Sequence, residues 1–388
     1  MNLSLDEKFV TLCLALDDIL GKGCLVESFF GNINLYKFSK EFSDINKIKN
    51  EFLKLYDEIM YSSDKYLSEI RKEYLMKHIK SILCQIDIFT DKNKNNYVDT
   101  VNLLFDISIE EPKIYNIEKL YIELVELLIQ NGYNFPKDCI IEKWNDLNFI
   151  SGSEAIKEIN IISKELKELS IKKVIEPLLK NVSSDFIKNI KINYNAIRTE
   201  RGWSAYNFYE RNYHGNVSLN LDKYFNKKTL KSLVAHESFP GHHTEYAIRE
   251  YKYKHMNSGE ENAIALLNTP SCAISEGLAE CGLMILGISD NEENQIDIKY
   301  RRLVKEIQYY ISYNTFVNQK NIDTILEENK IISKVCNSYE IKRFLNFMNH
   351  WKYYVPVYKY GANIVEKVNN IEELYTPNVP SYYTRKYN

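Results

Sequence analysis

The sequence contains few residues that interrupt helices. It has 13 glycines and 8 prolines among 388 residues, whereas these two types together make up roughly 12% of an average protein. Long segments without such residues favour helices. Hydrophobic residues account for 45% of the chain and charged residues for 27%, which is ordinary for a soluble globular protein. We therefore expect a mainly α fold that contains a small β-sheet.

The sequence also lacks the signals of several functional classes. Its net charge is −3, and no basic stripe of the kind that binds nucleic acid is evident. No run of about 18 apolar residues predicts a transmembrane helix, and the first residues do not resemble a signal peptide. The seven cysteines are scattered without a C-x-x-C pair, which argues against a disulfide framework and a cysteine metal site. We expect a cytoplasmic protein without a nucleic-acid or membrane partner.

The segment 1–195 shows the pattern of successive amphipathic helices. Apolar residues recur every three to four positions along 45–59, 117–127 and 156–169, as one face of a helix requires. These segments carry no inward cluster of titratable groups. We interpret segment 1–195 as a helical scaffold.

The pattern changes in the residues that follow. Val217, Leu219 and Leu221 alternate with polar residues, which is the period of a half-buried strand. The residues His214-Gly215-Asn216 are typical of a turn before that strand, so we expect a short antiparallel hairpin. Helices are expected in the remainder at about 228–239, 271–286, 293–318, 338–350 and 356–367.

The segment from His236 to His243 carries the strongest chemical signal. It reads His-Glu-Ser-Phe-Pro-Gly-His-His. In the motif H-E-x-x-H, two histidines one helical turn apart bind zinc, and the glutamate beside the first is the general base. Here Pro240 stands four residues after His236 and cannot bind a metal. The second histidine ligand must therefore come from position 242 or 243.

Helix geometry favours His242 over His243. In a straight helix, a residue seven positions on is displaced by about 10.5 Å along the axis, too far to share an ion with His236. Pro240 disturbs the helix and Gly241 tolerates unusual backbone angles, so two residues can loop out. His242 would then occupy the usual place of the second ligand. His243 remains the alternative ligand, or a residue that supports the site or touches the substrate.

A third ligand is expected, since catalytic zinc usually has three protein ligands and one open position. Glu276 and Glu280 are four residues apart in a segment that predicts a helix, so they share a face. One of them can bind the metal while the other orients a ligating histidine through its ring N–H. We take Glu276 as the ligand and Glu280 as the orienting or ordinarily paired carboxylate. Gly277 weakens the helix, which indicates the close approach of another element.

These residues resemble the signature of a bacterial protein family known as domain of unknown function 885. The family pattern H-E-x-x-P-G-H-H matches in full from His236 to His243, and the pattern E-G-W-A-x-Y matches at Glu276, Gly277 and Ala279. The resemblance covers roughly residues 200–370. Weaker similarities to the family patterns E-x-x-R-Y and Y-K-x-G lie at Glu340–Phe344 and Tyr358–Gly361.

The resemblance implies a metallopeptidase with a mostly helical fold similar to the gluzincins, a class of zincins. On this reading the segment 196–388 is the zinc-binding catalytic region. The sequence departs from the family at Leu278, where the family has Trp, and at Cys281, where it has Tyr. Both departures leave the ligands intact. We expect these two positions to line the substrate cleft and to affect substrate preference.

The predicted reaction is hydrolysis of a peptide or a small amide with one zinc ion per chain. Zinc lowers the pKa of its water and polarises the carbonyl, and Glu237 carries the water proton to the leaving amine. The strand near 217–221 is expected to line the cleft and to bind an extended peptide along its edge. Candidate donors to the oxyanion are Tyr358, His214, Arg301 and Arg302.

Two alternatives stay open at this point. One keeps the zinc but changes the reaction, as in a tailoring enzyme that acts on a small amide or acyl compound. The other is a non-catalytic homologue that binds a ligand or a partner. The intact set of His236, Glu237, His242 and Glu276 argues against the second alternative.

Overall fold

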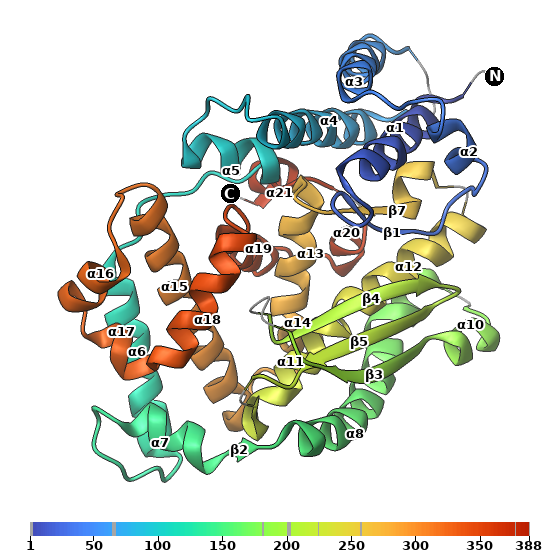
Figure 1. Cartoon of the computed structure of the whole chain (residues 1–388). Helices are drawn as coiled ribbons and strands as arrows, with labels where there is room; N and C mark the ends of the chain where they lie inside the picture. Colours follow the sequence, from blue (N-terminus) through green and yellow to red (C-terminus); the bar gives the residue numbers. More distant parts are fainter. Residues whose placement is uncertain are drawn as a thin grey trace.

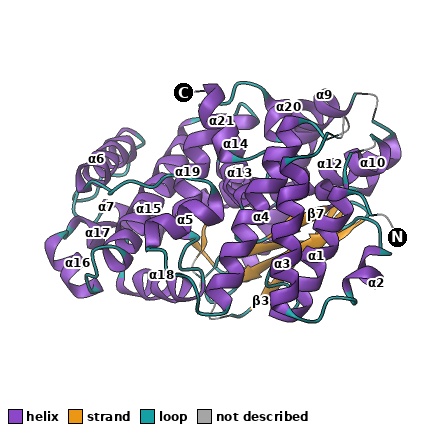
Figure 2. Cartoon of the chain, turned by 90° about the horizontal axis from the view of Figure 1, so that it is seen from above, coloured by secondary structure: helices purple, strands orange, loops and turns teal. Residues whose placement is uncertain are grey.

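The computed structural model describes residues 3–63, 67–180, 182–199, 203–223, 225–256, 258–376 and 378–387. Most of these residues lie in helices and the few strands are short, so the expected mainly α fold with a small sheet is confirmed. Figure 1 shows the helices in chain order, and Figure 2 shows the strands gathered in one part of a helical molecule.

The N-terminal helices follow the predicted apolar faces. The first helix begins at a capping box, because Ser4 Oγ accepts a hydrogen bond from the Glu7 amide and the Glu7 carboxylate accepts one from the Ser4 amide. The helices are α1 (Leu5–Leu20), α2 (Leu35–Ser39), α3 (Ile45–Met60), α4 (Glu69–Phe89), α5 (Tyr97–Phe105), α6 (Ile114–Gln130), α7 (Ile140–Leu147), α8 (Gly152–Ser170), α9 (Glu176–Leu179) and α10 (Ser184–Asn189).

The C-terminal helices lie close to the predicted positions, with one division. The segment expected at 271–286 is two helices separated at Cys281. No helix among the described residues is long and apolar enough to cross a membrane. The helices are α11 (Leu230–Glu237), α12 (His242–His255), α13 (Pro270–Glu280), α14 (Gly282–Ile285), α15 (Glu292–Phe316), α16 (Ile322–Glu328), α17 (Ile331–Val335), α18 (Ser338–His350), α19 (Val355–Val365), α20 (Ile371–Leu374) and α21 (Pro380–Tyr387).

The strands form small sheets rather than one continuous layer. The strands are β1 (Val26–Phe29), β2 (Phe149–Ile150), β3 (Lys191–Ile197), β4 (Ala205–Arg211), β5 (His214–Asn220), β6 (Phe225–Asn226) and β7 (Ile264–Leu266). β1 pairs with β7, β2 pairs with β6, and the largest sheet has the order β3-β5-β4. In that sheet β5 is parallel to β3 and antiparallel to β4. Because β5 is paired along both edges, the prediction that it binds a peptide along its edge is wrong.

The turn between β4 and β5 lies two residues earlier in the chain than the sequence indicates. Its turn residues are Asn212 and Tyr213, with φ of 54° and 67°, as a two-residue type I′ turn requires. The Glu250 carboxylate accepts both of their amide hydrogen bonds, each at 3.0 Å. The predicted turn at 214–216 is therefore wrong, since these residues already belong to β5. Gly215 is needed there for another reason: a Cβ would lie 2.6 Å from the ring of His243.

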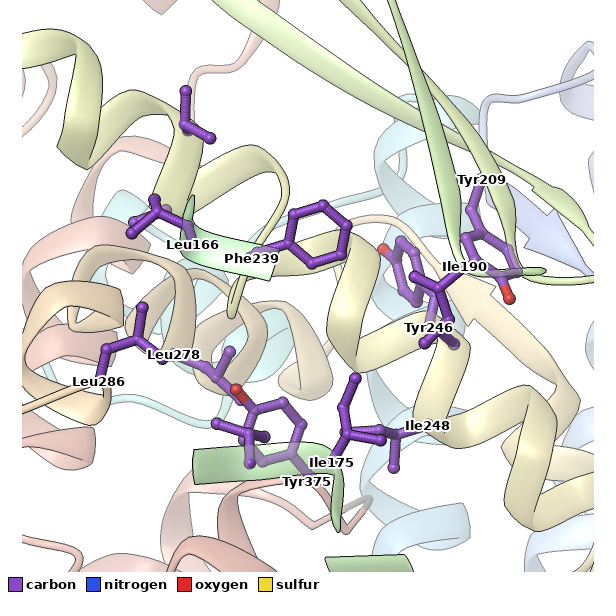
Figure 3. Packing of buried hydrophobic residues seen from close by; sticks show 14 of the residues in the cluster. Leu166, Ile175, Ile190, Tyr209, Phe239, Tyr246, Ile248, Leu278, Leu286 and Tyr375 are labelled. Carbon is purple, nitrogen blue, oxygen red and sulfur yellow. The ribbon is translucent and has the colours of Figure 1, made fainter. Parts of the chain in front are cut away.

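The hydrophobic core combines residues from both sides of position 195. In the largest cluster, Leu166 of α8 packs with Phe239 and with Leu278 of α13 (Figure 3). A second cluster joins α1, α3 and α4 to β7, and a third joins α6 and α7 to α15 and α18. Strand β3 also runs across residue 195. The segments 1–195 and 196–388 thus share their cores.

Candidate metal centre

The break between α11 and α12 brings two histidines together. Helix α11 ends at Glu237, and α12 begins at His242. At Gly241 a Cβ would lie 1.9 Å from the His236 carbonyl oxygen, so only glycine lets the chain turn this tightly against the end of α11. The imidazole rings of His236 and His242 are 4.8 Å apart and almost perpendicular. The predicted loop of extra residues is confirmed.

The side chains of His236, His242 and Glu276 converge on one point. Oε2 of Glu276 lies 3.3 Å from Nε2 of His236 and 3.7 Å from Nε2 of His242. One ligand atom from each residue lies within 4.8 Å of the other two. Among the described residues, this Oε2 is a buried oxygen with no hydrogen-bond partner. Two imidazole nitrogens and a carboxylate oxygen are a usual ligand set of catalytic zinc, so the residues present fit one ion.

Carboxylates lie behind both imidazoles. Nδ1 of His236 is 3.3 Å from Oε1 of Glu280 but makes no well-directed hydrogen bond among the described residues, so Glu280 is a charged neighbour at the position predicted for the orienting carboxylate. Nδ1 of His242 is 3.1 Å from the Ser275 hydroxyl, and that hydroxyl donates to Glu245. Partners of this kind fix the ring orientation and the tautomer of a metal-bound histidine. Both rings therefore present Nε2 to the oxygen of Glu276.

Helix α19 holds Glu276 from the other side. The Tyr354 hydroxyl, at the start of α19, donates a hydrogen bond of 2.8 Å to Oε1 of Glu276, which leaves Oε2 to the histidines. The close approach predicted from Gly277 is confirmed, because a Cβ there would lie 2.2 Å from the Gly361 carbonyl oxygen of α19. The two glycines allow the backbones of α13 and α19 to touch.

The charges around the cluster favour a cation. Burial lowers the pKa of His242, but the adjacent Glu276 and the other nearby carboxylates raise it to about 10 in the metal-free protein. Burial raises the pKa of Glu276, and the two histidines bring it well below its usual range. Burial likewise raises the pKa of Glu280, and Arg301 and Lys305 lower it further than burial raises it. Positive charge is thus stabilised between the two Nε2 atoms, as bound protons or as a metal ion.

Tyr358 lies beside the cluster as a protonated donor. Its ring is 6.4 Å from the His236 ring, and Lys305 Nζ lies 3.7 Å from its centre. Burial, followed by the charges of Glu276 and Glu280, raises the pKa of Tyr358 well above its usual value. Its hydroxyl therefore stays protonated and can donate a hydrogen bond to an anion.

Glu237 occupies the end of α11 next to the first histidine. Its side chain is buried, and its carbonyl oxygen accepts a hydrogen bond from the Asn207 amide of β4. The hairpin thereby fixes the backbone that carries this glutamate. Its carboxylate makes no hydrogen bond or ion pair with another described residue, and its charge acts on His242 and Tyr358. The carboxylate is therefore available to a bound molecule.

Two histidines that the sequence singled out are not brought to the cluster. His243 is fully buried between Tyr209 and Phe239, with ring distances of 5.4 and 5.7 Å. It is a core residue and not a ligand or a substrate contact. His214 is the first residue of β5, about 10 Å along the strand from Val217, which is the partner of Asn207. Strand pairing explains this position. The end of the hairpin that contains Asn207 and Val217 contacts Glu237, whereas His214 lies at the turn end.

The two arginines have separate roles. Arg301 is held by Oε1 of Glu280 at 3.1 Å, so it supports the carboxylate behind His236 instead of facing the ligand atoms. Arg302 pairs with Glu366 and keeps 47% of its side chain exposed. Arg302 therefore points away from the cluster, as neighbouring helix positions must diverge.

The positions that depart from the family pattern do not line the site. Leu278 is fully buried in the largest core cluster (Figure 3). Cys281 is also buried, with its thiol facing the Ala362 carbonyl oxygen of α19. The expectation that these two residues line a substrate cleft is wrong, because both face the packed interior on the α13–α14 side.

Several residues of the site were not predicted from the sequence. Glu245 and Ser275 are close in sequence to His242 and Glu276, so their spacing along the helices could have identified them as neighbours of the ligands. Tyr354, Lys305 and Glu27 come from distant segments with no recognisable motif. The carboxylate of Glu27, on β1, accepts hydrogen bonds from Tyr206 and Tyr246.

A hollow of about 540 Å³ lies away from the cluster, near α7 and the start of α15. Its lining includes Trp144, Lys228, Glu293 and Ile296, but none of the residues that converge on Glu276. The hollow therefore has no part in the chemistry of the candidate metal centre.

Comparison with known proteins identifies the fold but not an activity. No family model matches the chain, and no curated protein matches it. A candidate lipoprotein from Colwellia psychrerythraea is similar in structure, with a TM-score of 0.56 and 14% identity over 91% of this chain and 68% of that chain. A second candidate lipoprotein, of unknown function, from Shewanella oneidensis gives a TM-score of 0.50 and 13% identity over 92% and 76%. At these identities the likeness shows a shared fold alone.

Proposed function

We propose that this protein is a zinc-dependent hydrolase that cleaves peptide or small amide bonds. The observation that carries the proposal is the convergence of Oε2 of Glu276 with Nε2 of His236 and Nε2 of His242 inside a buried cluster. Two imidazole nitrogens and one carboxylate oxygen are a usual ligand set of catalytic zinc. A metal ion held by these three residues would use all three atoms as ligands.

The other residues have the chemistry that hydrolysis needs. A zinc ion held there would lower the pKa of a water molecule and polarise a carbonyl group. The unpaired carboxylate of Glu237 accepts the water proton and passes it to the leaving nitrogen. The protonated hydroxyl of Tyr358 donates to the oxygen that becomes negative during attack. Glu280 and Ser275 hold the two imidazoles in place.

Metal content is the first test. The purified protein should contain about one zinc per chain by elemental mass spectrometry. His242→Asn and Glu276→Gln should each weaken zinc binding by at least tenfold, measured by competition with a chromogenic chelator. His255→Asn, at the far end of the same helix α12, is the matched control and should bind zinc like the parent. A parent protein that takes up no zinc even after addition would contradict the proposal.

Activity is the second test, and it separates the alternatives. Glu237→Gln should keep its zinc and lose about 10²–10⁴-fold in turnover of aminoacyl or peptidyl amides. Turnover of small acyl compounds without any peptide would favour the tailoring enzyme. A zinc-loaded protein with no turnover in either panel would favour a homologue that only binds.

A further inference from the structure

Glu27 is a carboxylate at the edge of the candidate metal centre that the proposed hydrolysis leaves without a role. It lies on β1, far in sequence from the ligands, yet two residues of the site region hold it. Tyr206 donates 3.1 Å to its Oε1, and Tyr246 donates 2.6 Å to its Oε2. Tyr246 follows His242 by four residues on α12, which is one turn or about 6 Å along the same face. The charge of Glu237 acts on the Tyr206 hydroxyl as well.

The two phenols leave this carboxylate incompletely satisfied. An ionised carboxylate has about four acceptor positions on its two oxygens, and the phenols fill two of them. The side chain also keeps part of its surface exposed, so the remaining positions can be reached. Burial raises the pKa of Glu27, and the charges of His242 and Glu276 also act on this carboxyl group, as expected for a group near the ligands.

Among the described residues, Glu27 has no cationic partner, whereas several other glutamates with little exposed surface have one; Glu237, the proposed general base, is also unpaired. Glu250 pairs with a lysine, and Glu261 and Glu280 pair with arginines. No Lys, Arg or His nitrogen of the described residues lies within ion-pair distance of Glu27. A carboxylate in such surroundings is stabilised by a cation that donates hydrogen bonds.

We infer that Glu27 binds the free ammonium group at the amino end of a peptide or an aminoacyl amide. This inference rests on the proposed hydrolase function and names its substrate class. The ammonium group and the first carbonyl carbon of a peptide are separated by a single Cα. Glu27 is held by Tyr246, whose backbone lies one helical turn from His242, so a ligand whose ammonium group binds Glu27 would direct a bond near its amino end towards the metal. The protein is accordingly an exopeptidase that removes residues from the amino ends of peptides. A peptide whose amino end is acetylated would not be a substrate.

The test compares two ligands that differ only in the ammonium group, leucinamide and N-acetylleucinamide. Binding is measured by calorimetry on zinc-supplemented Glu237→Gln protein, so that the ligand is not consumed. Leucinamide should bind at least tenfold more tightly than its acetylated form. Introducing Glu27→Gln into the Glu237→Gln protein should abolish most of this difference in affinity. Adding Glu260→Gln is the matched control, because this carboxylate also accepts from a tyrosine of α12, Tyr253, and the preference should persist.

The preference measured on Glu237→Gln protein with Glu27 intact can overturn the inference even if the Glu27 variant does not fold. Equal or tighter binding of N-acetylleucinamide overturns the inference, and so does undetectable binding of leucinamide at millimolar concentration. Preference for the ammonium ligand in a protein without hydrolytic activity would support the role of Glu27 while contradicting the proposed function. Cleavage of internal bonds in acetylated peptides would support the proposed hydrolase function while contradicting the role of Glu27.

Discussion

The substitution Gly277→Ala tests whether the contact between α13 and α19 sets the geometry of the candidate metal centre. The added Cβ would lie 2.2 Å from the Gly361 carbonyl oxygen and 2.3 Å from its carbon. An ordinary contact begins at about 3.4 Å, so the two helices must separate by about 1.2 Å. The obstacle is backbone, which cannot rotate away as a side chain does.

Two opposing free-energy contributions determine the expected change in stability. Alanine is favoured over glycine in a helix by about 1 kcal/mol, whereas overpacking costs about 1–3 kcal/mol or more. The clash here is with backbone, so we expect a net destabilisation of about 1–2 kcal/mol. Moving α13 displaces Glu276, and moving α19 displaces Tyr354, which holds it. Metal sites tolerate only about 0.2 Å, so zinc affinity should fall by about 10–100-fold.

Two measurements check this reasoning. Urea unfolding gives the change in stability, and chelator competition gives the change in zinc affinity. Gly282→Ala is the graded control, because its Cβ would lie 3.1 Å from the Ala235 side chain, a contact relieved by a few tenths of an ångström. The control should therefore change both quantities less. A Gly277→Ala protein that unfolds and binds zinc like the parent would refute the role of this helix contact.

Three further predictions concern the same site. Ser275→Ala should weaken zinc binding by about tenfold without loss of the fold, and unchanged affinity in the chelator assay would contradict its role behind His242. Gly241→Ala should abolish zinc binding, because its Cβ would lie 1.9 Å from the His236 carbonyl oxygen. The pKa of His242 is raised to about 10 in the metal-free protein from a usual 6.5. The stability it contributes is present below pH 6.5 and lost as the pH rises through 10, so the unfolding temperature in chelator should fall across that range, and a flat profile would count against the buried charge cluster.

Local patterns in the sequence were enough to predict much of the fold and the three side chains that converge in the candidate metal centre. The apolar period of residues 45–59 predicts α3, and the capping box at Ser4 predicts the start of α1. The spacing of His236 and His242 around a Pro-Gly pair predicts the broken helix. These features depend on neighbours within a few turns, and such neighbours are readable from a single chain.

Other features depend on distant contacts and could not be predicted in this way. The position of the hairpin turn is set by the carboxylate of Glu250, which binds the amides of Asn212 and Tyr213. The burial of His243 and Leu278 results from packing against segments far away in the chain. Their residue types are equally compatible with a role in a functional site.

The sequence by itself determined the helical character of the chain and the identity of three candidate ligands, because residue type and spacing within a helix are enough for both. Only the tertiary structure decided which groups stand behind those ligands. Tyr354 reaches Glu276 across 78 positions of the chain, and Glu27 reaches Tyr246 across 219. Contacts of this range arise from the packing of distant helices and strands, which no local pattern encodes.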